Sequence, residues 1–288
     1  THNSNSSKKE VLGFYVNWLS SYANSYDSFQ ENHQNIDMIA PFWYTLKPDG
    51  SIESRYGGHQ YDAAQLADRK NVKVLPLINN SNKNNMILVN PEVRNKAINN
   101  VVELVNKYNY GGVNIDFEFI PSWTRDGYTS FIKKLSTKLK ANNKLLTVSV
   151  FPKIDVPLSL HGAYDYEAIS PYVDRVVIMT YDHNWSTGSP GPIAPLDWVE
   201  DNIKYALEYI PREKLILGIA NYGYDWPPSD VGKDLSTKKA VAVAKDRSVE
   251  IKWDKESHSP YYTYWNDSGK KHEVWFENSY SMEYKLKL

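Results

Sequence analysis

Seven apolar, strand-like runs recur along this chain at a nearly constant interval. They begin at Val11, Met38, Lys73, Gly112, Leu145, Arg175 and Lys214, so successive starts lie 27, 35, 39, 33, 30 and 39 residues apart. That interval fits one strand, one crossover helix and two loops. Several runs are apolar almost throughout, which is typical of parallel strands covered on both faces. Seven such units favour an α/β fold of the (β/α)8 TIM-barrel type over an open doubly wound sheet, whose Gly-rich phosphate loop the sequence lacks.

Two segments between the runs carry helical periodicity. After Pro91, a favourable first-turn residue, one face is formed by Val93, Ala97, Val101, Leu104 and Tyr108. In the next unit the corresponding face is formed by Tyr128, Phe131, Ile132, Leu135 and Leu139. These segments are therefore predicted to be crossover helices of neighbouring units.

The repeating pattern changes after Tyr224. Residues from about 225 to 276 are polar. They contain β-type pieces at 249–254, 261–265 and 272–276 and a short helical piece near 238–245. The turn Asn266–Gly269 predicts a hairpin between the last two β-type pieces. We interpret the region as a small α+β insertion after the seventh barrel strand.

The two ends of the chain fit this organisation less closely. Residues 1–10 are polar and rich in Ser and Asn, and we predict a disordered leader or linker there. Residues 11–288 are assigned to the barrel domain with its insertion. A helix is expected from about Ser279, and no run remains for an eighth strand. A seven-stranded remnant would expose two sheet edges, so we expect the chain to be incomplete at its C-terminus.

Composition excludes some function classes. The net charge is −1 and the pI about 6.6, which favours neither a nucleic-acid nor a membrane partner. Cysteine is absent, and the seven histidines lack metal-ligand spacing, so no metal is expected. Aromatic residues make up 14% of the chain, which leans toward carbohydrate because sugar clefts use aromatic faces.

The fourth run carries the strongest functional signal. Read as a strand, it places Asn114, Asp116 and Glu118 on one face. The other face is formed by Val113, Ile115, Phe117 and Phe119. Two carboxylates and an amide on a buried strand cost desolvation free energy unless they are paired or used. The alternative is an edge strand whose polar face is simply solvated.

Three strand ends together resemble glycoside hydrolase family 18, the chitinase-like hydrolases. Residues 111–118 resemble the family signature DGxDxDxE. Similar matches follow at 179–182 (MTYD) and 217–223 (LGIANYG), in the right order and at barrel-compatible spacing. Longer stretches are similar to the spore and cell-wall branch, whose members cleave after N-acetylglucosamine in cortex peptidoglycan. The resemblance covers nearly the whole chain and implies a catalytic barrel.

The resemblance also implies catalytic roles. Glu118 would protonate the glycosidic oxygen, and the acetamido oxygen of the substrate would attack the anomeric carbon. Asp116 would orient the acetamide and stabilise the positive charge, while its proximity to Glu118 raises the pKa of one of the two. Tyr181 would bind the acetamido carbonyl beside Asp182. The mechanism calls for neither a metal nor an organic cofactor.

Further residues are candidates for substrate binding. They are Asn114, Tyr15, Trp43, Asn79, Tyr222 and Trp226, with Trp18 as another aromatic near a strand end. Each aromatic residue has an alternative role in the core, and Tyr181 and Asp182 have structural alternatives as a core aromatic and a loop cap.

Two departures from the signature leave the function open. Gly111 and Asn114 stand where the family has Asp. The expected activity is hydrolysis of β-1,4-linked N-acetylglucosamine in peptidoglycan. The alternatives are a chitinase acting on chitin or chito-oligosaccharides, and a carbohydrate-binding pseudoenzyme. The expected partner is therefore a polysaccharide, bound by a monomer that is extracellular, in the cell wall or at the spore.

Overall fold

The computed structural model describes residues 9–17, 25–81 and 85–288. These residues form two compact units. Unit 1 comprises the chain up to Ser149 together with Gly162–Arg175, and unit 2 comprises Val150–His161 and Val176–Leu288. Most of the predicted leader, and Trp18, lie outside the described residues.

Unit 1 contains the first five predicted runs as strands. They form β1 (Leu12–Tyr15), β2 (Met38–Pro41), β3 (Tyr44–Leu46), β5 (Lys73–Val74), β6 (Leu77–Asn80), β7 (Gly112–Asp116) and β8 (Leu145–Val150, whose last residue belongs to unit 2). Parallel pairing joins β1 to β2, β2 to β5, β3 to β6, β6 to β7, and β7 to β8. A short strand, β4 (Ile52–Ser54), pairs antiparallel with β3. The predicted succession of parallel strands is confirmed here.

The second and third runs each form two short strands because prolines interrupt them. Pro41 ends β2, and Pro76 separates β5 from β6. Proline has no backbone N–H to donate to a ladder. The ladder nevertheless continues, since the Leu75 amide donates to the Ile39 carbonyl at 2.9 Å and the Asn114 amide donates to the Pro76 carbonyl at 3.1 Å.

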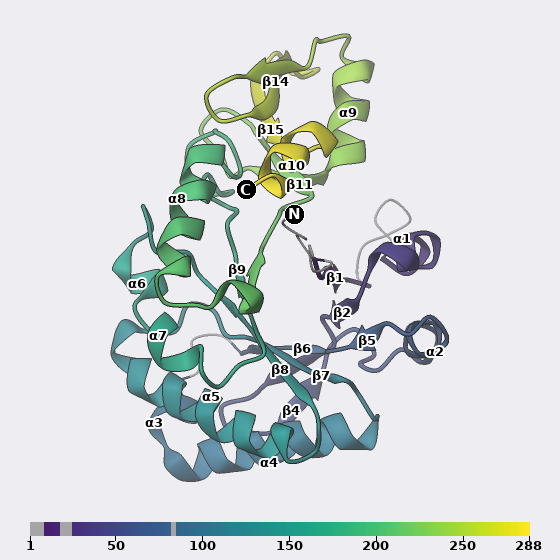
Figure 1. Ribbon diagram of the computed structural model, residues 1–288. Helices are drawn as coiled ribbons and strands as arrows, with labels where there is room; N and C mark the ends of the chain where they lie inside the picture. Colours follow the sequence, from purple (N-terminus) through teal and green to yellow (C-terminus); the bar gives the residue numbers. More distant parts are fainter. Residues whose placement is uncertain (1–8, 18–24, 82–84) are drawn as a thin grey trace, which may run out of the picture. The chain divides into compact units, whose positions relative to one another are not determined.

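The helices of unit 1 include both predicted crossover helices. They are α1 (Ser25–Asn32), α2 (Tyr61–Arg69), α3 (Met86–Val89), α4 (Pro91–Lys107), α5 (Arg125–Lys140) and α7 (Tyr166–Ile169), with 3-10 turns at His33–Asn35 and Ser122–Thr124. The side chain of Asn90 caps α4 by accepting from the Glu92 and Val93 amides. Helices α4 and α5 lie side by side (Figure 1).

The buried faces of these helices differ in how well the sequence predicts them. All five apolar residues predicted on α5 are buried. On α4, Ala97 and Val101 are buried as expected, but Val93, Leu104 and Tyr108 are only partly buried. The face is completed instead by Arg94, Ile98 and Val105. Arg94 can be buried because its guanidinium donates to the carbonyls of Ile87 and Leu88 at the end of α3.

Unit 2 contains the last two predicted runs and the insertion. Its elements are α6 (Leu158–His161), β9 (Arg175–Ile178, whose first residue belongs to unit 1), α8 (Leu196–Leu207), a 3-10 turn (Arg212–Lys214), β10 (Leu215–Leu217), β11 (Tyr222–Trp226), β12 (Lys233–Ser236), α9 (Thr237–Asp246), β13 (Lys252–Asp254), β14 (Ser259–Trp265), β15 (Lys271–Phe276) and α10 (Ser279–Leu286). Strands β9 and β10 pair in parallel. Among the described residues, no strand after β10 pairs in parallel. None of the helices in the described ranges is both long and apolar enough to cross a membrane.

The predicted insertion is an antiparallel sheet with its own core. Its strands follow the order β12-β11-β15-β14-β13. The core residues come from α9 and the sheet and are Ala240, Ala244, Tyr262, Tyr264, Val274 and Phe276. The expected hairpin joins β14 to β15 through Asn266–Gly269. Gly269 has a φ of +69°, a conformation that favours glycine.

A buried ion pair joins the last turn of α10 to Glu277, which lies just before the helix begins. The Lys285 ammonium donates to the Glu277 carboxylate at 2.8 Å, and their side chains are 1% and 0% exposed. Burial raises the pKa of Glu277, and Lys285 opposes that effect. The Glu277 amide also donates to the Tyr222 carbonyl at 3.0 Å. The start of α10 is therefore joined to β11.

Candidate active site

Strand β7 is fully buried between two parallel neighbours. All five of its residues are buried, and it pairs with β6 on one side and β8 on the other. This excludes the solvated edge strand. One prediction for this strand is wrong: Phe119 does not continue the apolar face but is 51% exposed. The strand ends at Asp116, and Phe119 has a left-handed backbone with a φ of +54°.

Two glycines precede the polar residues of β7, and they differ in how freely they could be replaced. A Cβ on Gly112 would lie 2.1 Å from the Leu145 carbonyl oxygen, so β8 passes too close for any side chain. A Cβ on Gly111 would lie 3.1 Å from the Lys73 Cβ, whose position is set by the backbone of β5. A side chain at Gly111 is therefore excluded less strongly than one at Gly112, but it would still require β5 to shift slightly.

Asn114 is satisfied by hydroxyl groups of β8. Its Nδ2 donates to Thr147 Oγ1 at 2.8 Å, and its Oδ1 accepts from Ser149 Oγ at 3.2 Å. The side chain has no exposed surface. These bonds fix the amide inside the sheet, so its placement supports a structural role, and its expected contact with substrate stays a prediction.

Asp116 and Glu118 form a carboxylate pair at the end of β7. Asp116 is 4% exposed, whereas Glu118 is partly exposed. Burial, the charge of Glu118 and a hydrogen bond with it raise the pKa of Asp116 well above its ordinary value, while Arg55 opposes the rise. The predicted rise in one member of the pair thus falls on Asp116. The pair retains a proton to higher pH than an isolated aspartate does.

The backbone around Glu118 is held by two side chains. Asn80, the last residue of β6, accepts from the Glu118 amide at 2.8 Å and donates to the Glu118 carbonyl at 2.9 Å. The hydroxyl of the fully buried Tyr164 donates to the Phe117 carbonyl. Glu118 therefore lies on a backbone segment whose polar groups are hydrogen-bonded by Asn80 and Tyr164.

Three other predicted residues of unit 1 lie in or beside its core. Tyr15 is 4% exposed and donates to Gln60 Oε1 at 3.0 Å, and burial raises its pKa to about 12. Trp43 has no exposed surface and packs edge-on against Tyr15. Its burial speaks against a role as a sugar platform. Asn79 is partly buried and accepts from Thr45 Oγ1 at 2.6 Å.

Unit 2 holds the third predicted carboxylate, Asp182, among tyrosines. Tyr222 and Tyr224 both donate to Asp182 Oδ1, at 2.6 and 3.0 Å. Burial by the surrounding atoms raises the pKa of Asp182, and the two hydroxyl groups lower it. The residue as a whole stays accessible to solvent, and its backbone is left-handed with a φ of +58°.

The aromatic residues around Asp182 form one cluster. Tyr181 packs edge-on against Tyr222, with 6.3 Å between ring centroids. The Tyr224 ring packs against Tyr222, with 5.8 Å between ring centroids, and against Trp226, with 5.4 Å between ring centroids. Trp226 is only 2% exposed, so it supports this cluster from inside and does not present an open face.

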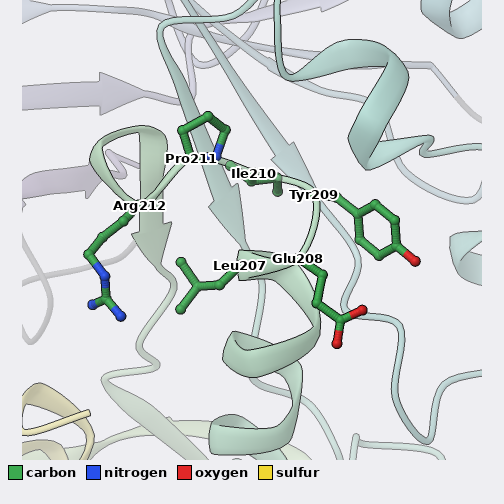
Figure 2. Close-up of a pocket in the computed structure, with 6 residues that line it drawn as sticks. All are labelled: Leu207, Glu208, Tyr209, Ile210, Pro211 and Arg212. Carbon is green, nitrogen blue, oxygen red and sulfur yellow. The ribbon is translucent and has the colours of Figure 1, made fainter.

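A shallow hollow elsewhere in unit 2 does not resemble a site. Figure 2 shows it at the C-terminal end of α8, lined by the consecutive residues Leu207, Glu208, Tyr209, Ile210, Pro211 and Arg212. The Glu208 and Arg212 side chains point away from each other. The hollow contains none of the residues that carry the predicted chemistry.

Several residues of the site were not predicted from the sequence. They are Asn80, Tyr164, Thr147, Ser149, Tyr224 and Arg55. Alternating hydroxyl residues in the apolar run at 145–150 could have indicated Thr147 and Ser149, because buried hydroxyl groups need partners. The roles of Asn80 and Tyr164 depend on strand register and on a distant loop, which no local pattern specifies.

The family follows from the whole chain. The sequence model for glycosyl hydrolases family 18 matches residues 10–288. The chain therefore belongs to this family.

Three known proteins show which kinds of family 18 protein this chain is similar to. The Bacillus subtilis protein YdhD, named as a sporulation-specific glycosylase, is 32% identical over 263 residues, which cover 87% of this chain and 62% of YdhD. This chain thus spans about three fifths of that relative's length. The crystal structure of the Bacillus megaterium spore cortex-lytic enzyme SleL is 26% identical, with a TM-score of 0.86 over 96% of this chain and 67% of SleL. A chitinase from Chromobacterium violaceum is 28% identical, with a TM-score of 0.85 over 94% of this chain and 87% of the chitinase.

These likenesses establish the fold class. The match to SleL extends over 96% of the chain. The chain has the α/β fold of the (β/α)8 TIM-barrel class that the strand spacing predicts.

Proposed function

We propose that this chain is a retaining glycosidase that cleaves β-1,4-linked N-acetylglucosamine in spore-cortex peptidoglycan with assistance from the substrate. The observation that carries the proposal is the carboxylate pair at the end of β7. The pair retains a proton because Asp116 is buried and hydrogen-bonded to the more accessible Glu118. A pseudoenzyme that had lost turnover would have no need to keep a buried carboxylate beside a second one, because such a pair costs folding free energy.

The chemistry follows from the different environments of the two carboxyl groups. Glu118 donates a proton to the leaving glycosidic oxygen, and the acetamido oxygen of the substrate attacks the anomeric carbon to form an oxazolinium ion. Asp116, which is ionised once the pair has given up its proton through Glu118, accepts from the acetamide N–H and stabilises the positive charge. Glu118 then accepts a proton from a water molecule. That water opens the oxazolinium ring, and the configuration at the anomeric carbon is retained. Tyr181 and Asp182 are proposed to contact the substrate.

Two observations support cortex peptidoglycan as the substrate and leave chitin as the second candidate. YdhD is named as sporulation-specific and SleL as spore cortex-lytic. The chitinase from C. violaceum matches this chain with nearly the same TM-score, 0.85. We propose that the protein acts on a polysaccharide outside the cell, at the spore.

The test is release of reducing ends from purified spore cortex and from chitin oligomers. Glu118→Gln should lower turnover by about a hundredfold to ten-thousandfold, as loss of a general acid does. Glu103→Gln, on the exposed side of α4, is the matched control and should retain full turnover. The preferred substrate distinguishes cortex lysis from chitin hydrolysis. Sugar binding without turnover by the unmodified protein would indicate a pseudoenzyme.

A further inference from the structure

Strand β7 ends two residues before Glu118, yet the Glu118 backbone is bonded as if the ladder continued. The last registered pair between β6 and β7 is Asn79 with Asp116. Beyond it, the Asn80 side chain accepts from the Glu118 amide at 2.8 Å and donates to the Glu118 carbonyl at 2.9 Å. A side-chain amide carries the same donor and acceptor as a peptide group. Asn80 therefore supplies one further rung to the ladder.

The chain needs this rung because it turns sharply after Glu118. Phe119 adopts a left-handed backbone with a φ of +54°. That conformation is unfavourable for a residue other than glycine. The two hydrogen bonds from Asn80 help to offset its cost.

The position of the Glu118 backbone determines what its carboxyl group reaches. Asp116 is fixed within the buried strand, so the hydrogen bond between the two carboxyl groups depends on where Glu118 lies. Tyr164 already holds the preceding carbonyl, that of Phe117. Asn80 acts on Glu118 itself.

We propose that Asn80 is a positioning residue that sets the location of the general acid Glu118 through its backbone, without touching the substrate. The inference rests on the proposed function for its kinetic consequence, but its geometric consequence can be measured without turnover. A displacement of about 1 Å in a catalytic group can lower the rate about a hundredfold.

The variants are chosen to separate positioning from folding. Asn80→Ala removes both hydrogen bonds. Asn80→Asp keeps the acceptor for the Glu118 amide but loses the donor to the carbonyl. Asn100→Ala is the matched control, because Asn100 donates to a backbone carbonyl of unit 1, that of Gly50, at 2.8 Å and contacts none of the proposed catalytic residues.

Two readouts follow. In kinetics on the preferred substrate, Asn80→Ala should lower kcat at least tenfold with KM changed less than twofold, Asn80→Asp should lie between it and the wild type, and Asn100→Ala should match the wild type. In a carbon-13 titration of the side-chain carboxyl groups, Asn80→Ala should lower the pKa of Asp116, because Glu118 raises that pKa in the native protein. Asn100→Ala should leave the Asp116 titration unchanged.

Three results would overturn the proposal. They are an unchanged kcat in Asn80→Ala, a raised KM at constant kcat, and a native Asp116 titration in both Asn80 variants. If the wild-type protein releases no reducing ends, the proposed function fails, but the titration still decides whether Asn80 holds Glu118. If Asn80→Ala does not fold, Asn80→Asp decides both readouts.

Discussion

Asp116 in unit 1 and Asp182 in unit 2 are both carboxylates near strand ends whose pKa burial raises. Their partners differ. Asp116 hydrogen-bonds a second carboxyl group, which raises its pKa further. Asp182 accepts from the hydroxyl groups of Tyr222 and Tyr224, which lower its pKa. The comparison indicates that neighbours of different chemistry shift the pKa of a carboxyl group in opposite directions.

The largest expected effect is on turnover. Asp116→Asn should lower kcat about a hundredfold or more, because the substrate acetamide loses its negatively charged partner. Asp182→Asn should lower it only about tenfold, the effect of weakening one hydrogen-bonded contact. Initial rates on spore cortex at a fixed pH check the ranking. Equal losses would show that the two carboxylates do not have distinct roles.

The second effect is on the pH dependence of stability. Because the folded-state pKa of Asp116 is raised above its ordinary value of 3.8, the folded protein binds more protons than the unfolded chain between those two pKa values. The contribution of Asp116 to stability is therefore fully present below pH 3.8 and is lost as the pH rises through the folded-state pKa.

Asp116→Asn removes the loss of stability that ionisation of the buried Asp116 causes as the pH rises. It should stabilise the protein by about 1 kcal/mol or more near pH 7 relative to wild type, with the gain vanishing near pH 4. Asp182→Asn should give a smaller gain in the same direction, since its tyrosine partners already offset part of its burial. Urea unfolding at both pH values measures the difference. A larger gain for Asp182→Asn would reverse the comparison.

The smallest expected effects concern two tyrosines of unit 1 that pack edge-on, with centroids 5.3 Å apart. Tyr164 donates to the Phe117 carbonyl, whereas the buried Tyr128 hydroxyl has no hydrogen-bond partner among the described residues. Tyr164→Phe should therefore cost about 1–2 kcal/mol of unfolding free energy. Tyr128→Phe should be neutral or stabilise by less than about 1 kcal/mol. Denaturant titration of the two variants provides the test, and equal losses would contradict it.

The extent to which sequence predicts this molecule depends on how local each signal is. Helix α5 is predicted residue by residue because its long apolar face repeats with the helical period. Helix α4 is predicted in extent but not in its buried face, since Arg94 is buried by carbonyl groups of α3 that periodicity cannot show. The strand succession is predicted, but the splitting of β5 from β6 at Pro76 is not, although proline itself is the signal.

The residues of the candidate active site are likewise predicted only where the signal is local in the sequence. The alternation in β7 predicts that Asn114 and Asp116 share a face, because side chains of a strand alternate by geometry alone, and both residues are buried in the strand. It fails at Phe119, where the strand has already ended. Trp43 is a candidate for substrate binding with an alternative role in the core, and its ring packs against Tyr15 inside unit 1. The role of Asn80 becomes visible only once the register of β6 with β7 is known.

The buried Lys285 gives α10 a built-in reporter of its own opening. An amine-reactive reagent reaches a lysine only when its nitrogen meets solvent, and the Lys285 side chain is 1% exposed against Glu277. Lys287, two residues further along, is 66% exposed and is modified from the folded state. In a time course of labelling followed by mass spectrometry, the same peptide therefore carries both the reference and the signal. The lag between the two modifications measures how often the end of α10 opens and the Lys285–Glu277 ion pair breaks.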